Sequence, residues 1–269
     1  MILLKKIFSF FFCYLVVSRE ELIASSPVHS RITDTYFPTF LEISFEEALT
    51  QCLALSIQPS HYSASAVLRS TTTSSFTCCV SHPATDSKAA TDRALVFAIA
   101  DWKYSENIPC HWQTLATVYS KFTGEKTTVY RYGSHWENIG FQGSDPVTDL
   151  RSAGYLGLLH LLFFALHAPT LSTQCFSISK HQQNHFPLAV MGLNFTKMVM
   201  SAIRSGRLQV SKNRLTSVSV PGTALHVSDR FVLASCKLYV SLWQNFYNIW
   251  TSKNCTIHNS HEVLQSNLF

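Results

Sequence analysis

Residues 145–169 read DPVTDLRSAGYLGLLHLLFFALHAP and contain a long apolar run. Asp145 is a residue type favoured at a helix N-cap, and Pro146 suits the first helical turn. The residues that follow are apolar on every side of a helix, which is typical of a helix buried on all faces. Pro169 lacks an amide hydrogen and is expected to end the helix. The sequence therefore predicts one buried central helix from about Pro146 to about Ala168.

Segments on both sides of this run predict five further helices, over about 44–55, 92–102, 111–123, 188–205 and 231–250. Ser44 and Glu47 form a capping box for the first helix, and Asp92 is an N-cap residue for the second. Apolar residues three and four apart give the third helix and the last helix an apolar face. Gly124 and Gly206 suit the left-handed position that often follows a helix end.

No stretch alternates apolar and polar residues with the period of a β-strand. The expected fold class is all-α, an irregular multi-helix bundle. A helical domain is placed at residues 44–255, after an N-terminal hydrophobic segment and linker at 1–43 and before a C-terminal tail at 256–269. Residues 56–92, rich in Ser, Thr and Ala, and residues 207–228 are expected to be mostly loop.

The composition restricts the classes of function. Apolar residues make up 46% of the 269-residue chain and charged residues 14%, which is enough apolar material for a real core. The formal charge is +5, and Lys and Arg form no stripe interleaved with aromatic residues, so nucleic-acid binding is not expected. The eight cysteines fit neither a zinc pattern nor a disulfide framework, and free thiols in a reducing compartment are expected. His181 and His185 have no acidic residue between them, which favours surface histidines over a metal site.

Residues 1–18, MILLKKIFSFFFCYLVVS, resemble a targeting segment, because two lysines precede an apolar run at residues 7–17. The run is shorter than the ~20 residues that a helix needs to span a bilayer. Asn194 and Asn254 begin Asn-X-Thr sequons, which would fit entry into the secretory pathway. This segment could act as a cleaved signal, as a membrane anchor or as neither, and the sequence leaves these three alternatives open. The rest of the chain favours a cytoplasmic protein, with membrane or cytoskeletal association as a variant of that expectation.

Residues 136–158, WENIGFQGSDPVTDLRSAGYLGL, carry the pattern that points to a function. Gly140 and Gly143 are expected to allow a tight turn, and Gly154 and Gly157 to permit close approach between helices. The pattern resembles the signature of the ELMO domain family, through Trp136, Ile139–Gly143, Asp145, Pro146, Thr148, Asp149, Arg151, Gly154 and Leu156–Leu158. The resemblance extends over about residues 44–255 and includes Leu115–Gly124, Phe186, Pro187 and Leu193–Thr196.

This resemblance implies a GTPase-activating protein for small GTPases of the Arf and Arf-like family, with Arg151 as the arginine finger. An arginine suits that role, because its planar guanidinium stabilises the charge that develops on the transferring phosphoryl group. GTP and magnesium would be bound by the partner GTPase, and no cofactor is expected for this chain. The resemblance also implies a set of candidate GTPase-binding residues: Trp136, Gly140, Phe141, Gln142, Gly143, Asp145, Pro146, Thr148 and Asp149.

Two polar residues of the signature have a second interpretation. Arg151 would equally suit a structural ion pair with Asp149 or Asp145, which would hold the loop before the helix. Gln142 would orient a water molecule or, as is more common in a turn flanked by glycines, take part in backbone hydrogen bonding. The first interpretation of each residue makes it part of a catalytic site, and the second makes it part of the scaffold.

Two aromatic residues, Trp136 and Phe141, are as compatible with the core as with a contact surface. The chain also departs from the family pattern, with Ser152 after the arginine where Gly is common and Leu150 where Phe is common. The alternative function is therefore a non-catalytic ELMO-type adaptor in cytoskeletal or membrane-traffic signalling. A secreted protein, suggested by residues 1–18, is the third alternative.

Overall fold

The central apolar run forms helix α7 (Gly154–His167) in the computed structural model, and a separate short helix, α6 (Val147–Leu150), precedes it. The prediction of one continuous helix was therefore wrong at residues 151–153. Gly154 has a φ of 54°, and a Cβ atom added there would lie 2.0 Å from the carbonyl oxygen of Ala100. The chain turns at this point because another segment touches the backbone of Gly154. Arg151 consequently follows the end of α6 instead of lying inside a helix.

The structure describes residues 41–56, 87–125, 129–208, 217–219, 226–228 and 230–266, and all of these belong to one unit that spans residues 37–269. The targeting-like segment at residues 1–18 lies outside the described residues. So do the rest of the linker up to residue 40 and most of the two predicted loops. Statements about structure below concern the described residues.

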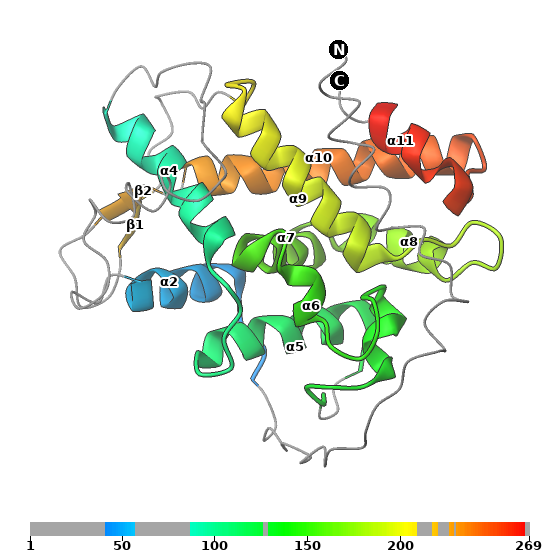
Figure 1. Cartoon of the computed structure of the whole chain (residues 1–269), viewed down its shortest axis with the longest axis horizontal. Coiled ribbons are helices and arrows are strands. Elements are labelled where there is room, and N and C mark those ends of the chain that lie inside the picture. The colour runs from blue at the N-terminus through cyan, green and yellow to red at the C-terminus, as the bar shows by residue number, and fades with distance from the viewer. Residues whose placement is uncertain are drawn as a thin grey trace. The chain divides into compact units, whose positions relative to one another are not determined.

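Helix α7 lies at the centre of these elements (Figure 1). The other long helices are α2 (Phe45–Ser56), α4 (Ser87–Asp101), α5 (Pro109–Thr123), α8 (Pro169–Ser179), α9 (Leu188–Arg204) and α10 (Arg230–Ser252). All six of them pack against α7. The shorter helices are η1 (Ser134–Ile139), η2 (Ile257–Asn259) and α11 (Ser260–Ser266). The all-α class that the sequence predicts is confirmed, because the described strands are limited to two short ones.

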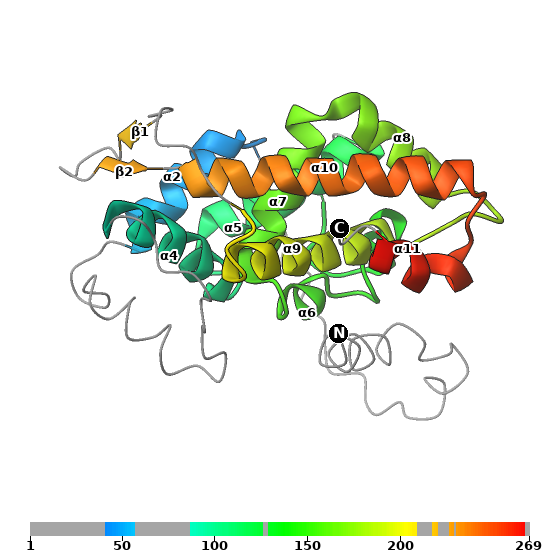
Figure 2. The same cartoon turned by 90° about the horizontal axis from the view of Figure 1, so that it is seen from above.

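The core owes its stability to burial of apolar side chains around α7. Every residue of α7 from Gly154 to Ala165 is buried. Helices α9 and α10 run side by side over α7 (Figure 2) and contribute aromatic rings to the core. Phe164 of α7 stacks on Trp243 of α10 with ring centroids 4.7 Å apart. Each large side chain buried in this way contributes about 1.5–3 kcal/mol to stability.

Several predicted helix ends are confirmed. The hydroxyl of Ser44 accepts a hydrogen bond of 3.1 Å from the amide of Glu47, which caps α2. Gly124 has a φ of 75°, and its amide donates to Ser120 at the end of α5. Gly206 has a φ of 69° just after α9. Cap chemistry in the sequence was therefore a reliable guide to where these helices begin and end.

Other boundaries differ from the prediction. Helix α4 begins at Ser87, and Asp92 is a buried residue inside it rather than its cap. Pro169 does not only end a helix, because it is also the first residue of α8, which the sequence analysis missed. Proline is well suited to a first helical position, so the same residue fits both roles.

Two segments that were predicted to be a loop (207–228) and a C-terminal tail (256–269) contain regular secondary structure. Within residues 207–228, strand β1 (Ser217–Ser219) pairs antiparallel with strand β2 (His226–Ser228). Beyond residue 255, α11 packs against α10, and its Val263 and Leu264 are buried. The packed helices therefore continue into the predicted tail.

No described helix is by itself long and apolar enough to cross a membrane. Helices α7 and α8 reach the required length and apolarity only as a pair, with a bend of 110° between them. The structure describes four cysteines as free thiols, at positions 110, 175, 236 and 255, and all four are buried.

Candidate functional site

Arg151 lies at the end of α6 with its side chain exposed. Its Nε donates a hydrogen bond of 2.8 Å to the carbonyl oxygen of Thr148, one turn earlier. Among the described residues, Arg151 forms an ion pair with no carboxylate, so the expected structural pairing with Asp149 or Asp145 is not observed. Its guanidinium is held by the backbone of α6 at one nitrogen only.

Asp145 forms an ion pair with a different arginine, Arg131. Its Oδ1 accepts hydrogen bonds from Nη1 of Arg131, at 2.8 Å, and from the amide of Val147, at 2.9 Å. The second of these bonds forms a turn immediately before α6, whose N-cap residue is Pro146 instead of the predicted Asp145. The carbonyl oxygen of Asp145 accepts from both the amide and the hydroxyl of Thr148, at 3.2 and 2.8 Å. Asp145 therefore fixes the one turn of helix that ends at Arg151.

Asp149 closes the loop from the other side. Its Oδ2 accepts a hydrogen bond of 2.7 Å from the amide of Gln142. Burial raises the pKa of Asp149 to about 6, although the hydrogen bond from Gln142 and the charges of Arg151 and Lys197 act in the opposite direction. The amide of Gln142 is thus a backbone donor, as the scaffold interpretation expected, while its side chain is exposed.

Three of the predicted GTPase-binding residues, Trp136, Phe141 and Pro146, are buried. Trp136 is fully buried and packs edge-on against the rings of Phe141 and Trp112. These side chains belong to the core, so they offer no surface to a partner. Of the two interpretations of Trp136 and Phe141, core residue and contact residue, the structure therefore supports the first, as expected for large apolar side chains.

The two glycines of the turn have different surroundings. Gly140 has a φ of 85°, and a Cβ atom there would lie 2.2 Å from the backbone nitrogen of Leu188, so the turn packs tightly on the start of α9. Gly143 has a φ of 74°, and no atom lies within 4 Å of the position of its Cβ. Gly140 is thus a packing residue, whereas Gly143 borders open space.

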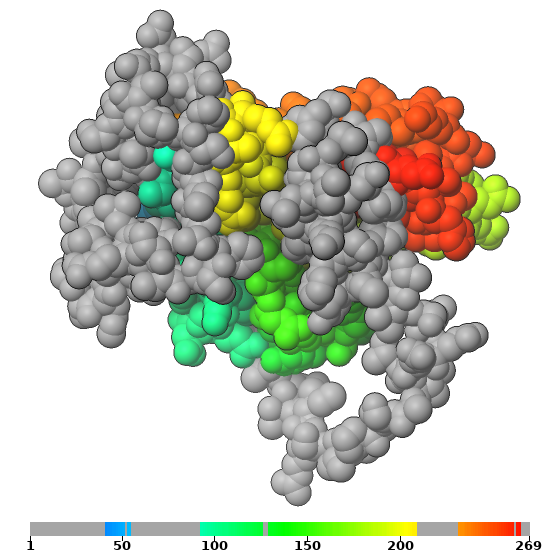
Figure 3. Space-filling model, turned by 45° about the horizontal axis from the view of Figure 1, so that its top comes forward, coloured from blue at the N-terminus to red at the C-terminus, as the bar shows by residue number. Residues whose placement is uncertain are grey.

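Exposed or partly exposed members of the predicted set are Gly140, Gln142, Gly143, Asp145, Thr148 and Asp149. They form one continuous loop and helix turn together with Arg151. The green part of the chain, which includes α6, reaches the surface beside the yellow end of α9 in Figure 3. The structure therefore gathers the polar part of the signature on the surface and leaves its aromatic part in the core.

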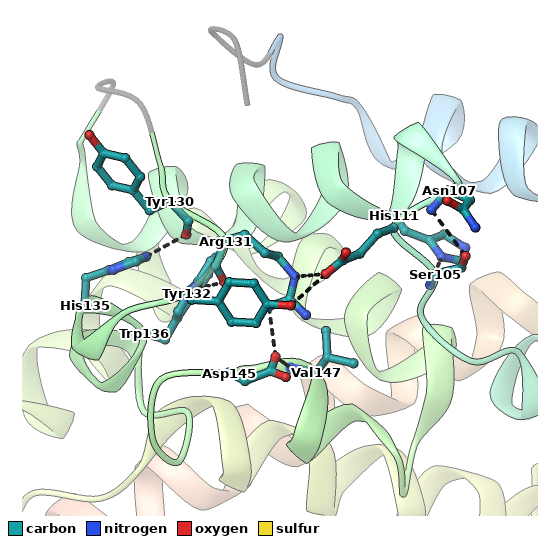
Figure 4. Close-up of polar contacts among 11 residues, drawn as sticks. Ser105, Asn107, His111, Tyr130, Arg131, Tyr132, His135, Trp136, Asp145 and Val147 are labelled. Atoms are coloured by element: carbon teal, nitrogen blue, oxygen red, sulfur yellow. Dashed lines mark hydrogen bonds and ion pairs between the residues drawn. The ribbon is translucent and has the colours of Figure 1, made fainter. Parts of the chain in front are cut away.

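Arg131 is a site residue that the sequence analysis missed. Its side chain is only 3% exposed, and it bonds Oε1 of Glu106 at 3.0 Å as well as Asp145 (Figure 4). Burial by itself would lower the pKa of Arg131, but the hydrogen bond and the charge of Asp145 raise it above its ordinary value. The guanidinium lies 5.2 Å from the ring centre of Tyr104 and 4.5 Å from that of Tyr132. The local sequence signal for a buried arginine was its position between Tyr130 and Tyr132.

The loop that carries Glu106 is itself anchored in the core. Nδ1 of His111 accepts a hydrogen bond of 3.0 Å from the amide of Ser105. The imidazole of His111 stacks on the ring of Tyr155, with centroids 4.3 Å apart, and burial lowers its pKa to about 4. A neutral histidine therefore fixes the residue next to Glu106.

Metal chemistry finds no support in the described residues, where no three His, Cys, Asp or Glu side chains come together. His181 and His185 are exposed and lie in the turn between α8 and α9, so they do not share a helix face. The chemistry that the candidate site can offer is a cationic, planar guanidinium on a fixed helical turn.

Comparison with known proteins identifies the family. A model described as the ELMO/CED-12 family matches residues 94–264. ELMO domain-containing protein 3 of Homo sapiens is 34% identical over 176 residues, which cover 65% of this chain and 43% of that protein. ELMO domain-containing protein 2 of Mus musculus is 34% identical over 100 residues, or 37% of this chain and 34% of that protein. Ankyrin repeat and ELMO domain-containing protein D of Dictyostelium discoideum is 25% identical over 162 residues, or 60% and 12%.

In each of these three relatives, the match spans less than half of the relative's own length. No solved structure matches the chain significantly. The family model extends from α4 to α11 and includes the whole signature at residues 136–158. On the extent of this match, the chain belongs to the ELMO/CED-12 family.

Proposed function

We propose that this chain is a GTPase-activating protein for a small GTPase of the Arf or Arf-like family, and that Arg151 supplies the guanidinium. One observation carries the proposal: Arg151 is exposed, and among the described residues no carboxylate forms an ion pair with it, although Asp149 lies near enough to be influenced by its charge. The two nearby carboxylates bind Arg131 and the amide of Gln142 instead. An arginine in this state is available to a phosphate group of a partner.

The chemistry needs what Arg151 can offer. Hydrolysis of GTP develops negative charge on the oxygens around the transferring phosphoryl group, and an inserted guanidinium stabilises that charge. Known arginine fingers accelerate the reaction by ~10³–10⁵. Arg151 donates to Thr148 through Nε, and among the described residues neither terminal nitrogen of its guanidinium forms an ion pair with a carboxylate, which suits a bidentate contact with phosphate.

The serine that follows is compatible with this role. The hydroxyl of Ser152 donates a hydrogen bond of 3.3 Å to the carbonyl oxygen of Asp149, so it turns back onto α6. The extra atoms relative to glycine therefore lie against the helix. We expect the departure from the family pattern to weaken the activity little.

Single-turnover hydrolysis of GTP by a panel of purified Arf and Arf-like GTPases tests the proposal. The full 269-residue chain is added as wild type, as Arg151→Lys and as Arg207→Lys, a matched change at another exposed arginine. We expect stimulation by the wild type and by Arg207→Lys. The Arg151→Lys variant should lose at least ~100-fold of that stimulation, since a lysine cannot replace the planar fork.

Equal stimulation by all three proteins would remove the catalytic role of Arg151. Binding to a GTPase without stimulated turnover would support the adaptor alternative instead. Circular dichroism of each variant establishes that the helices are intact, so that a loss of stimulation reports on the site.

A further inference from the structure

The position of Arg151 depends on a chain of contacts that begins at a buried ion pair. Arg131 is 3% exposed, and its guanidinium bonds two carboxylates, those of Glu106 and Asp145. These three residues come from three segments: the connection between α4 and α5, the segment before η1, and the start of α6. Figure 4 shows Arg131 and Asp145 near each other, with the ring of Tyr132 beside them. We call the three residues the Arg131 clamp.

The backbone of the clamp is fixed as well. The carbonyl oxygen of Arg131 accepts a hydrogen bond of 3.1 Å from Nε1 of Trp136, which is fully buried. Next to it, the amide of Gly133 donates to the carbonyl oxygen of Ser144 at 3.0 Å. The backbone at Arg131 is thus hydrogen-bonded to the core, and the bond from Gly133 to Ser144 joins the same two segments as the ion pair between Arg131 and Asp145.

From Asp145 the contacts continue to Arg151 through one residue. Thr148 donates to the carbonyl oxygen of Asp145 through both its amide and its hydroxyl. The carbonyl oxygen of Thr148 in turn accepts from Nε of Arg151. Helix α6 contains only four residues, and these bonds restrain its direction together with its packing against α7 and α9 and the burial of Leu150.

We infer that Arg131 is a positioning residue for Arg151, acting through Asp145 and the single turn of α6. The predicted effect of Arg131 on GTP hydrolysis rests on the proposed function. The clamp itself is a property of the loop that can be measured without any GTPase. A displacement of about 1 Å at a catalytic group can reduce a rate ~100-fold, which sets the size of the effect expected.

The experiment compares the full chain as wild type with Arg131→Met, Arg131→Lys and Val232→Ala. The last is a matched control that removes buried methyl groups of α10, away from the clamp. Hydrogen–deuterium exchange is followed in peptides covering residues 140–152 and in peptides of α10. Arg131→Met should raise exchange at 140–152 at least ~10-fold relative to α10, because the partly buried carboxylate of Asp145 loses its cationic partner. Arg131→Lys should restore part of the protection.

The stimulated hydrolysis of GTP is then measured with the same proteins and with Arg131→Met in the Arg151→Lys background. We expect Arg131→Met to lower the maximal stimulated rate ~10–100-fold with little change in the half-saturating concentration. In the Arg151→Lys background the same change should cause no further loss, because residues that act as one unit are not additive.

The inference would be overturned if, in Arg131→Met as in Val232→Ala, exchange at residues 140–152 rose no more than exchange in the peptides of α10. Fully additive losses in the double variant would also overturn it, because they would make Arg131 a residue of general stability. If the wild type stimulates no GTPase, the proposed function fails, and the exchange measurement still decides whether the clamp orders the loop.

Discussion

Two arginines of the site occupy opposite environments, and their chemistry differs accordingly. Arg131 is buried, and a buried cation is tolerated only when carboxylates and hydrogen bonds replace its water. Arg151 is exposed and keeps its hydration, so it loses that hydration only when a partner covers it. The fold thus provides ion pairs for Arg131 and leaves Arg151 exposed to solvent.

Asp149 offers a test at the scale of one side chain. Its pKa of about 6 in the fold lies above the ordinary value of 3.8, so the fold disfavours the charged form. The folded state therefore binds more protons than the unfolded state between pH 4 and 6, and the stability due to this group increases as the pH falls through that range. Asp149→Asn retains an acceptor for Gln142 and removes the charge.

We expect Asp149→Asn to raise the free energy of unfolding by about 2 kcal/mol at pH 7, and by almost nothing near pH 4. Urea denaturation of the two proteins at both pH values measures the difference. A variant that is less stable than the wild type at pH 7 would mean that Arg151 and Lys197 more than offset the effect of burial.

At the scale of the element, the two glycines of the turn before α6 make a matched pair. Both have a left-handed φ, so alanine at either position costs about 1–2 kcal/mol in backbone strain. At Gly140 the new methyl group would also collide with the backbone of Leu188, whereas at Gly143 it would enter open space. We expect Gly143→Ala to lose about 1–2 kcal/mol and Gly140→Ala more than about 3 kcal/mol.

Chemical denaturation of the two variants measures these losses. Equal losses would show that the contact between the turn and α9 is softer than the distances indicate. Gly143→Ala is also informative in the binding assay, because a partner that approaches the open backbone would meet the added methyl group.

Elements with strong local signals were predicted well from the sequence. The ends of α2, α5 and α9 follow from Ser44, Gly124 and Gly206, whose chemistry acts within a few residues. The break before α7 was not predictable in this way, because it depends on contact with Ala100, far away in the sequence. Residues 145–169 alone contain no information about that neighbour.

The same distinction applies to the candidate site. The resemblance pointed to the loop and to Arg151, whose role stays a prediction, and the residue type of Asp145 indicated a helix start within one residue of the observed one. Arg131 could not be found, because its partners Glu106 and Asp145 lie 25 residues before it and 14 residues after it. The sequence shows an arginine there, and only the packing shows that it is buried.

At the scale of the whole molecule, three helices meet at a buried histidine. His160 of α7 is fully buried, and its two ring nitrogens lie 3.1 Å from the hydroxyls of Thr196 on α9 and Ser235 on α10. Burial lowers the pKa of His160 to about 3, from an ordinary value of 6.5. The unfolded chain therefore binds a proton at His160 between pH 6.5 and 3 that the folded chain does not.

Stability should consequently fall as the pH decreases from about 6.5 towards 3. In His160→Gln, an amide can donate and accept in the same place but does not titrate. We expect the free energy of unfolding of the wild type to decrease by about 2 kcal/mol more than that of the variant between pH 7 and pH 5. Denaturation curves at the two pH values measure this, and parallel changes in both proteins would contradict it.

The burial of α7 on every side also has a consequence for synthesis of the chain. Helix α7 leaves the ribosome before α9 and α10, which later cover it. The nascent chain therefore presents an apolar helix that at first only the earlier helices α2, α4 and α5 can cover, and its cover stays incomplete until translation has passed Ser252, on the order of ten seconds at ordinary elongation rates. During that interval we expect the uncovered face of the helix to bind chaperones, and a chain that stops before α10 to be prone to aggregate.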